Sequence, residues 1–206
     1  MEDKNEIRLA RVWMWFSEHK DTLMDIDALD EEAAEAVLLE FDEVLKQYSE
    51  GIDFELGDLT QKGRTLLLTT GGNADYFEDV FDLCEQAPIL DFWEIIPLRQ
   101  PQGEKAVIRY GKYHYKAKEL YFVPLESDNE EDGVGIRVGI SNYEQDEEEQ
   151  YIAVYSLVEA IAGEYECGTM IDYFELCSLP ADIKNTDFIP LTDLPEFLLW
   201  ADGTKD

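Results

Sequence analysis

The residue types best able to bind a ligand are concentrated between positions 99 and 118, which hold six of the 16 basic residues of the chain. This stretch contains one acid, Glu104, so its net charge is +5 (6 − 1). Tyr110, Tyr113 and Tyr115 are interleaved with the cations, and such a mixture can hold phosphates and stack on flat ligands. The candidate ligand-binding or interface residues are Arg99, Arg109, Lys112, Tyr113, His114, Lys116 and Lys118.

Three interpretations of this segment are open. The favoured one is a basic hairpin that turns near Gly111 and faces the protein's own acidic helices, or those of a second copy in a homodimer. A second interpretation is a site for an anionic small ligand. The third is nucleic acid, which the charge on the rest of the chain would repel.

Acidic residues dominate the remainder of the chain, where 48 acids against 16 bases give a formal net charge of −32. Residues 21–58 carry 14 acids and one base, and residues 126–150 carry ten acids and one base. Such a field repels nucleic acid and anionic membranes and attracts basic proteins; the alternative origin of the acidity is a salt-adapted or generally acidic proteome. The predicted acidic interaction surface consists of Asp128, Glu130, Glu131, Asp132, Asp146, Glu147, Glu148 and Glu149.

Known motifs for catalysis, metals and cofactors do not occur in the sequence. The two histidines, His19 and His114, fall in different predicted elements, and the three cysteines form no CxxC pair, so zinc ligands are missing. The turn at 69–73 lacks the third glycine of a dinucleotide motif and the lysine of a P-loop. The segment 128–133 imitates a calcium loop but lacks the glutamate at position 12. We therefore expect no catalytic residues, no metal and no cofactor.

The elements that must position these residues follow the pattern of an α+β protein. Two helices, at 4–20 and 27–51, precede any strand, and Asp27 is the expected N-cap of the second. A strand–helix–strand unit occurs at 65–98 and again at 134–179, and two such units can share one mainly antiparallel sheet, as in ferredoxin-like folds. The predicted organisation is a helical N-terminal extension, 1–51, and an α+β domain, 52–206, in one continuous structural unit.

The expected compartment is the cytoplasm. The first residues lack the basic region and apolar stretch of a signal peptide. No apolar run reaches the roughly 18 to 20 residues that a membrane span requires. The odd number of cysteines fits reduced thiols. These patterns predict a protein that does not engage the membrane.

A set of residues between about 60 and 180 carries a family resemblance: Gly71, Gly72, Asn73, Phe77, Ala87, Pro88, Trp93, Arg99, Ala162, Gly163, Glu164, Tyr165 and Ile171. With these residues the chain resembles a group of uncharacterised bacterial cytosolic proteins. The resemblance implies an α+β domain and a bacterial origin. It brings no catalytic residues.

These features favour a non-enzymatic interaction protein that binds a basic partner, in the sharpest version an immunity protein or a nucleic-acid mimic. The alternative is a small-ligand-binding protein or enzyme whose site lies near the hairpin and uses Arg99, Arg109, His114 and the neighbouring tyrosines. The alternative requires these side chains to converge in one pocket.

Overall fold

The computed structural model describes residues 4–125 and 133–203, and the chain divides into two compact units, residues 1–98 (unit 1) and residues 99–206 (unit 2). The division follows Leu98 instead of residue 51, because the N-terminal helices bury their apolar faces in one core with the first three strands. Within the described residues, no helix is long and apolar enough to cross a membrane.

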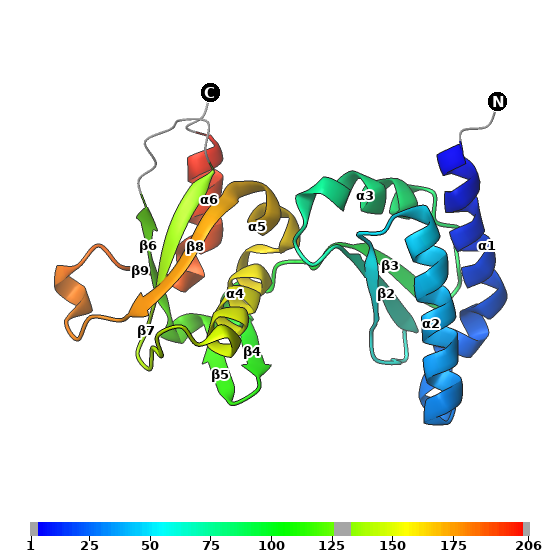
Figure 1. Cartoon of the computed structure of the whole chain (residues 1–206), viewed down its shortest axis with the longest axis horizontal. Helices are drawn as coiled ribbons and strands as arrows, with labels where there is room; N and C mark the ends of the chain where they lie inside the picture. Colours follow the sequence, from blue (N-terminus) through cyan, green and yellow to red (C-terminus); the bar gives the residue numbers. More distant parts are fainter. Residues whose placement is uncertain (1–3, 126–132, 204–206) are drawn as a thin grey trace. The chain divides into compact units, whose positions relative to one another are not determined.

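Unit 1 is a three-stranded sheet that shares one core with three helices (Figure 1). Its elements are α1 (Lys4–Met24), α2 (Glu31–Tyr48), β1 (Asp53–Leu56), β2 (Arg64–Thr69), α3 (Phe77–Glu85) and β3 (Trp93–Pro97), with 3-10 turns at Ile26–Ala28 and Ala74–Tyr76. The strand order is β1-β2-β3, with β1 antiparallel and β3 parallel to β2. The α+β class and the helices ahead of the first strand are confirmed.

Aromatic side chains bind the N-terminal helices of unit 1 to its sheet. The ring of Phe16 meets Trp93 edge-on at 4.9 Å between centroids, and Phe41 meets Phe54 at 4.6 Å. Such edge-to-face pairs add to the stability gained from apolar burial. The predicted N-cap of α2 is wrong, because the 3-10 turn at 26–28 delays the helix: Asp30 is the N-cap and accepts from the Ala33 N–H at 2.9 Å, while Asp27 pairs with Arg64.

Unit 2 contains a four-stranded sheet in the order β8-β7-β6-β9, a separate hairpin and three helices. Its elements are β4 (Val107–Tyr110), β5 (Tyr113–Lys116), β6 (Tyr121–Leu125), β7 (Val134–Ile140), α4 (Glu148–Ala162), α5 (Glu164–Met170), β8 (Ile171–Ser178), β9 (Ile189–Pro190) and α6 (Leu194–Asp202), with 3-10 turns at Gly103–Lys105, Ala117–Glu119, Ile183–Asn185 and Leu191–Asp193. In this sheet β7 is parallel to β8, and β6 is antiparallel to both β7 and β9.

Both predicted strand–helix–strand units are present, as β2-α3-β3 and as β7-α4-α5-β8, each with a parallel strand pair. The expectation that they share one sheet is wrong, because each parallel pair is hydrogen-bonded to different antiparallel strands, in separate sheets. β1 joins the first pair, whereas β6 and β9 extend the second. Each sheet consequently has its own core.

The predicted hairpin turns at Gly111, with Tyr110 paired to Tyr113 and Arg109 paired to His114. Gly111 has φ +54°, a left-handed conformation that glycine adopts without strain, and its place at the first central position is typical of a type II′ turn. A Cβ at this position would lie 3.0 Å from the Glu149 carboxylate in the first turn of α4. The turn therefore favours glycine for its left-handed conformation, whereas the exposed Glu149 side chain could move aside for a Cβ.

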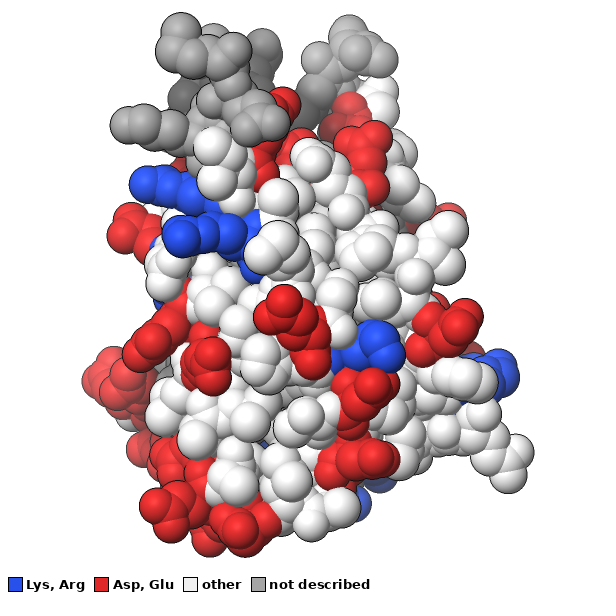
Figure 2. Space-filling model, turned by 90° about the vertical axis from the view of Figure 1, so that its right-hand side faces the viewer, with Lys and Arg blue, Asp and Glu red and all other residues white. Residues whose placement is uncertain are grey.

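Charge on the surface of unit 1 is mostly negative on the side where α1 and α2 lie. In the space-filling view of that side, Asp and Glu residues outnumber Lys and Arg residues and gather toward its lower end, with uncharged surface between them (Figure 2). Self-repulsion of this kind keeps a protein soluble and costs stability at low ionic strength.

Replacement of Gly111 by alanine should destabilise the protein by about 1–2 kcal/mol, the typical cost of a left-handed conformation in a residue with a Cβ. Gly203→Ala is the matched control, because Gly203 has φ −69° and a Cβ there would meet only ordinary contacts. Thermal and urea unfolding of both variants would measure the difference. Equal melting temperatures would contradict the role assigned to Gly111.

Candidate functional site: an acidic and aromatic pocket beside α4

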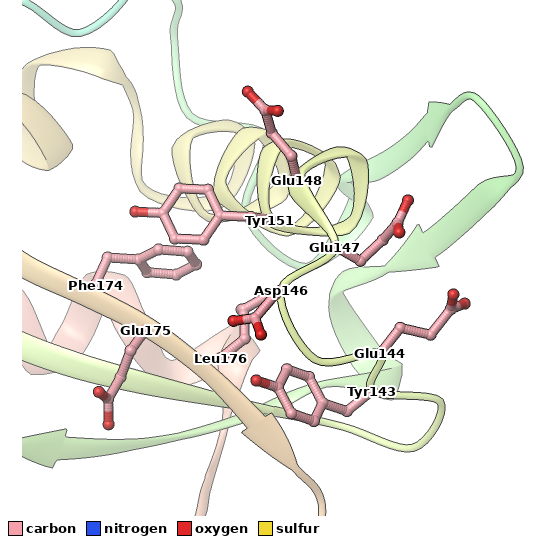
Figure 3. A pocket seen from close by; sticks show the side chains of 9 residues that line it. All are labelled: Tyr143, Glu144, Asp146, Glu147, Glu148, Tyr151, Phe174, Glu175 and Leu176. Atoms are coloured by element: carbon pink, nitrogen blue, oxygen red, sulfur yellow. The ribbon is translucent and has the colours of Figure 1, made fainter.

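A pocket of about 540 Å³ lies in unit 2 between the start of α4, the loop 141–147 that leads into this helix, and strand β8 (Figure 3). Five carboxylates and three aromatic rings line it. The lining residues are Tyr143, Glu144, Asp146, Glu147, Glu148, Tyr151, Phe174, Glu175 and Leu176. This acidic-aromatic pocket brings together residues from two separate segments of the chain, 143–151 and 174–176.

The rings form the wall of the pocket and the carboxylates surround them. Tyr151 meets Phe174 edge-on at 5.1 Å between centroids. Figure 3 shows the Asp146 side chain between this pair and Tyr143, while the other acids extend outward around the rim. Asp146 has φ +58°, a left-handed conformation that aspartate tolerates better than most residues. The pocket therefore has one central carboxylate and several peripheral ones.

A buried amide, Gln150, holds the loop in place. Its Nε2 donates to the Tyr115 hydroxyl at 2.8 Å and to the Asn142 carbonyl at 2.9 Å. Its Oε1 accepts from the Glu144 N–H at 2.8 Å. Gln150 has no exposed surface, so these bonds replace the water that the loop backbone would otherwise bind. One side chain thus joins α4, strand β5 and the loop.

The surroundings of the pocket shift the pKa of one carboxylate and one phenol of its lining, and of the neighbouring Tyr155. Burial raises the pKa of Tyr151, and burial is also the main reason that the pKa of Tyr155 rises to about 12. A hydrogen bond from Tyr173, followed by one from Arg137, lowers the pKa of Glu175, so this carboxylate stays ionised. The lining therefore combines the ionised Glu175 with the neutral ring of Tyr151.

This lining suits an organic cation. Carboxylates accept charge-assisted hydrogen bonds from ammonium and guanidinium groups, and aromatic faces attract the same cations. In residues 4–125 and 133–203, no three His, Cys, Asp or Glu side chains are grouped so that they could hold a metal ion.

Lys112 of the hairpin already shows this type of recognition within the chain. Its Nζ lies 3.0 Å from the Glu144 carboxylate and 5.0 Å from the centroid of the Tyr113 ring. The hydrogen bond to Glu144 raises the pKa of Lys112. The basic hairpin therefore meets the rim of the acidic-aromatic pocket.

The structure brings only some of the predicted anion-binding residues together. Arg109, His114 and Lys116 lie on one exposed face of the hairpin, because the turn resets the alternation of side chains. Tyr113 and Tyr115 lie buried on the opposite face, which packs against α4.

Arg99, Lys116 and Lys118 of the segment pair with acids of unit 2. Arg99 Nη1 lies 3.0 Å from Glu159, and its backbone N–H donates to the buried Glu164 carboxylate at 2.9 Å. The other exposed pairs are Lys116 with Glu119 at 3.3 Å and Lys118 with Glu104 at 2.9 Å. The partners of the lysines come from loops and 3-10 turns, not from the acidic helices that the sequence suggested.

Three of the predicted acidic residues, Asp146, Glu147 and Glu148, line the pocket. Glu149 instead lies beside Gly111. The other four, Asp128, Glu130, Glu131 and Asp132, lie outside the described residues. The sequence alone did not indicate the other residues of the site: Tyr143, Glu144, Gln150, Tyr151, Phe174, Glu175 and Leu176. The signal that could have indicated them is the pair of aromatic residues on either side of the acidic run 144–149.

Unit 1 has a second hollow with a different character. It is an open groove between α2 and β1 with an apolar lining of Ile26, Leu29, Ala34, Leu38, Phe54 and Leu56. Arg64, 4% exposed, also lines it, and among the described residues its buried Nε has no hydrogen-bond partner. It lacks the combination of carboxylates and several rings that distinguishes the acidic-aromatic pocket.

Comparisons with protein-family models, with curated proteins and with solved structures found no match to this chain.

The Gln150→Leu variant should lose about 2 kcal/mol or more of unfolding free energy, because the Asn142 carbonyl and the Glu144 N–H lose their partner. Gln145→Leu, at an exposed position of the same loop, should change stability by less than about 0.5 kcal/mol. Urea unfolding of the two variants measures the difference. Equal effects would show that Gln150 does not anchor the loop.

Simultaneous reversal of Lys112, Lys116 and Lys118 to glutamate should lower the melting temperature, because three ion pairs become repulsive contacts. Each exposed pair contributes little alone, so the triple variant is the proper test. The control reverses three lysines that have no ion pair within the described residues: Lys62, Lys105 and Lys184. Light scattering would detect a dimer that the first variant splits. An equal loss in both variants would mean that only the added net charge matters.

Proposed function

We propose that this protein is a non-enzymatic interaction protein that binds a basic partner protein. The acidic-aromatic pocket receives an arginine or lysine side chain of that partner. The observation that carries the proposal is the lining of the pocket, in which five carboxylates surround three aromatic rings. A cation in this position gains hydrogen bonds to carboxylates and contact with ring faces at the same time.

Two further observations support the proposal. Gln150 and its three partners hold the loop in one arrangement, so little conformational entropy is lost when a side chain enters. The net charge of −32 attracts a basic protein from a distance and accelerates its association. The rival proposal of a ligand site at the hairpin has weaker support, because Arg109 and His114 lie on the face opposite Tyr113 and Tyr115.

The test uses the acetylated tripeptide Arg-Arg-Arg-amide as a probe of cation binding, with calorimetric titration into the full chain. The Asp146→Asn, Glu147→Gln double variant should weaken binding about tenfold, since the probe loses two charged partners. Asparagine keeps the left-handed conformation of residue 146, so the fold should be unaffected. Tyr151→Leu should weaken binding about two- to fivefold, the effect of one exposed cation–ring contact.

The matched control is Asp187→Asn with Glu196→Gln, which removes the same two charges from exposed positions of unit 2 outside the pocket. It should weaken binding less than about threefold at physiological ionic strength, where distant charges are screened. Equal weakening in the pocket and control variants would show that only the overall charge attracts the probe, and the proposal would fail.

A further inference from the structure

Strand β8 borders the acidic-aromatic pocket and is an edge of its sheet. Among the described residues, in the order β8-β7-β6-β9, its only strand neighbour is β7, and the eight residues of β8 run along the open side. Phe174, Glu175 and Leu176, in the middle of this strand, line the pocket. An open edge of this length can continue its hydrogen-bond ladder into an extended segment of another chain.

The register shows which backbone groups of β8 point outward. The Leu179 N–H donates to the Ile140 carbonyl at 2.9 Å, so residue 179 faces β7. Backbone groups alternate in direction along a strand, so Tyr173, Glu175 and Cys177 also face β7. Phe174 and Leu176 then point their N–H and C=O groups to the open edge, and within the described residues no backbone partner of these two is found there.

The side chains of these two residues connect the edge to the pocket. Phe174 packs edge-on against both Tyr151 and Tyr155 of α4, at 5.1 and 5.3 Å between centroids. A strand added to β8 would place every second side chain on this same face, beside Asp146 and Tyr151. The alternate side chains would lie on the other face, near Tyr173, which is 54% exposed.

We propose that β8 pairs with an extended segment of the basic partner in which arginine or lysine alternates with apolar residues. The cationic side chains enter the acidic-aromatic pocket, and the apolar ones cover the ring of Tyr173. This inference rests on the proposed function and adds the form in which the partner binds. Charge selects this occupant over a second copy of the chain, since two copies of β8 would bring the five carboxylates of each pocket together.

The probe is the acetylated heptapeptide Val-Arg-Val-Arg-Val-Arg-Val-amide, titrated into the full chain at physiological ionic strength. Two further peptides are N-methylated on the backbone. One carries the methyl groups on the backbone nitrogens of its arginines, and the other on the backbone nitrogens of its inner valines. In an added strand only one of these sets points toward β8, so one methylated peptide should lose at least tenfold in affinity while the other stays within about threefold of the parent.

Amide hydrogen exchange locates the added strand directly. The heptapeptide should slow exchange at Phe174 and Leu176 at least tenfold, while Tyr173 and Glu175, already bonded to β7, should change little. Phe54 and Leu56 are the internal control, because the bond from Gly57 N–H to Thr65 O shows that they face the open edge of β1 in unit 1. Their exchange should not change.

Two results would overturn the inference. The first is equal binding of all three heptapeptides with unchanged exchange at Phe174 and Leu176; if Asp146→Asn with Glu147→Gln still weakened binding, the proposed function would survive alone. The second is protection of Phe54 and Leu56 in place of the β8 residues, which would assign strand addition to the other sheet. Failure of both the heptapeptide and the tri-arginine probe to bind would remove the proposed function as well.

Discussion

The buried amide of Gln150 is the interaction on which the pocket depends. The loop 141–147 carries four of the lining residues, and repulsion among its acids opposes any single arrangement. Gln150 offsets this repulsion with bonds to Asn142 and Glu144 of the loop and to Tyr115 of the hairpin. A glutamate in its place could not donate to the Asn142 carbonyl and would add a buried charge, which is costly without a partner. A neutral amide therefore replaces water here, because it accepts from the Glu144 N–H and donates to both the Tyr115 hydroxyl and the Asn142 carbonyl.

The acids around the pocket are partly compensated by the fold itself. Glu147 and Glu148 lie at the N-terminal end of α4, where the helix dipole favours negative charge. Lys112 neutralises Glu144, and Arg137 pairs with Glu175. Within the described residues Asp146 has no ion pair, although it occupies the centre of the lining. The fold thus stabilises the peripheral carboxylates and leaves the central one available to a cation.

Local features of the sequence predicted local features of the structure. Periodicity indicated both strand–helix–strand units. Gly111 indicated the hairpin, because a tight turn needs one residue in the left-handed conformation that glycine adopts readily. The partner of each strand could not be read in the same way, since the alternating pattern of β1 is the same whichever sheet it joins. Which side chains share a face of the hairpin depends on the exact position of the turn, because a shift by one residue exchanges the two faces.

The pocket itself was only half predictable. Asp146, Glu147 and Glu148 were visible as an acidic run, but Phe174 lies 26 residues after Glu148, and periodicity does not reveal contacts across such a distance. The role of Gln150 was hidden for a related reason. A glutamine in the first turn of a helix is ordinary, and its importance arises from the carbonyl and hydroxyl that two other segments bring to it.

The acidity and the open edge of β8 are physically connected. An unpaired edge strand exposes hydrogen-bonding groups that invite association between copies, and charged side chains along the edge are one way to prevent it. Around β8 this charge is negative and concentrated in the pocket, so a copy of the same chain is repelled while a basic segment is attracted. Under the proposed function, the field that costs the folded chain stability at low ionic strength also opposes pairing between two copies of this edge.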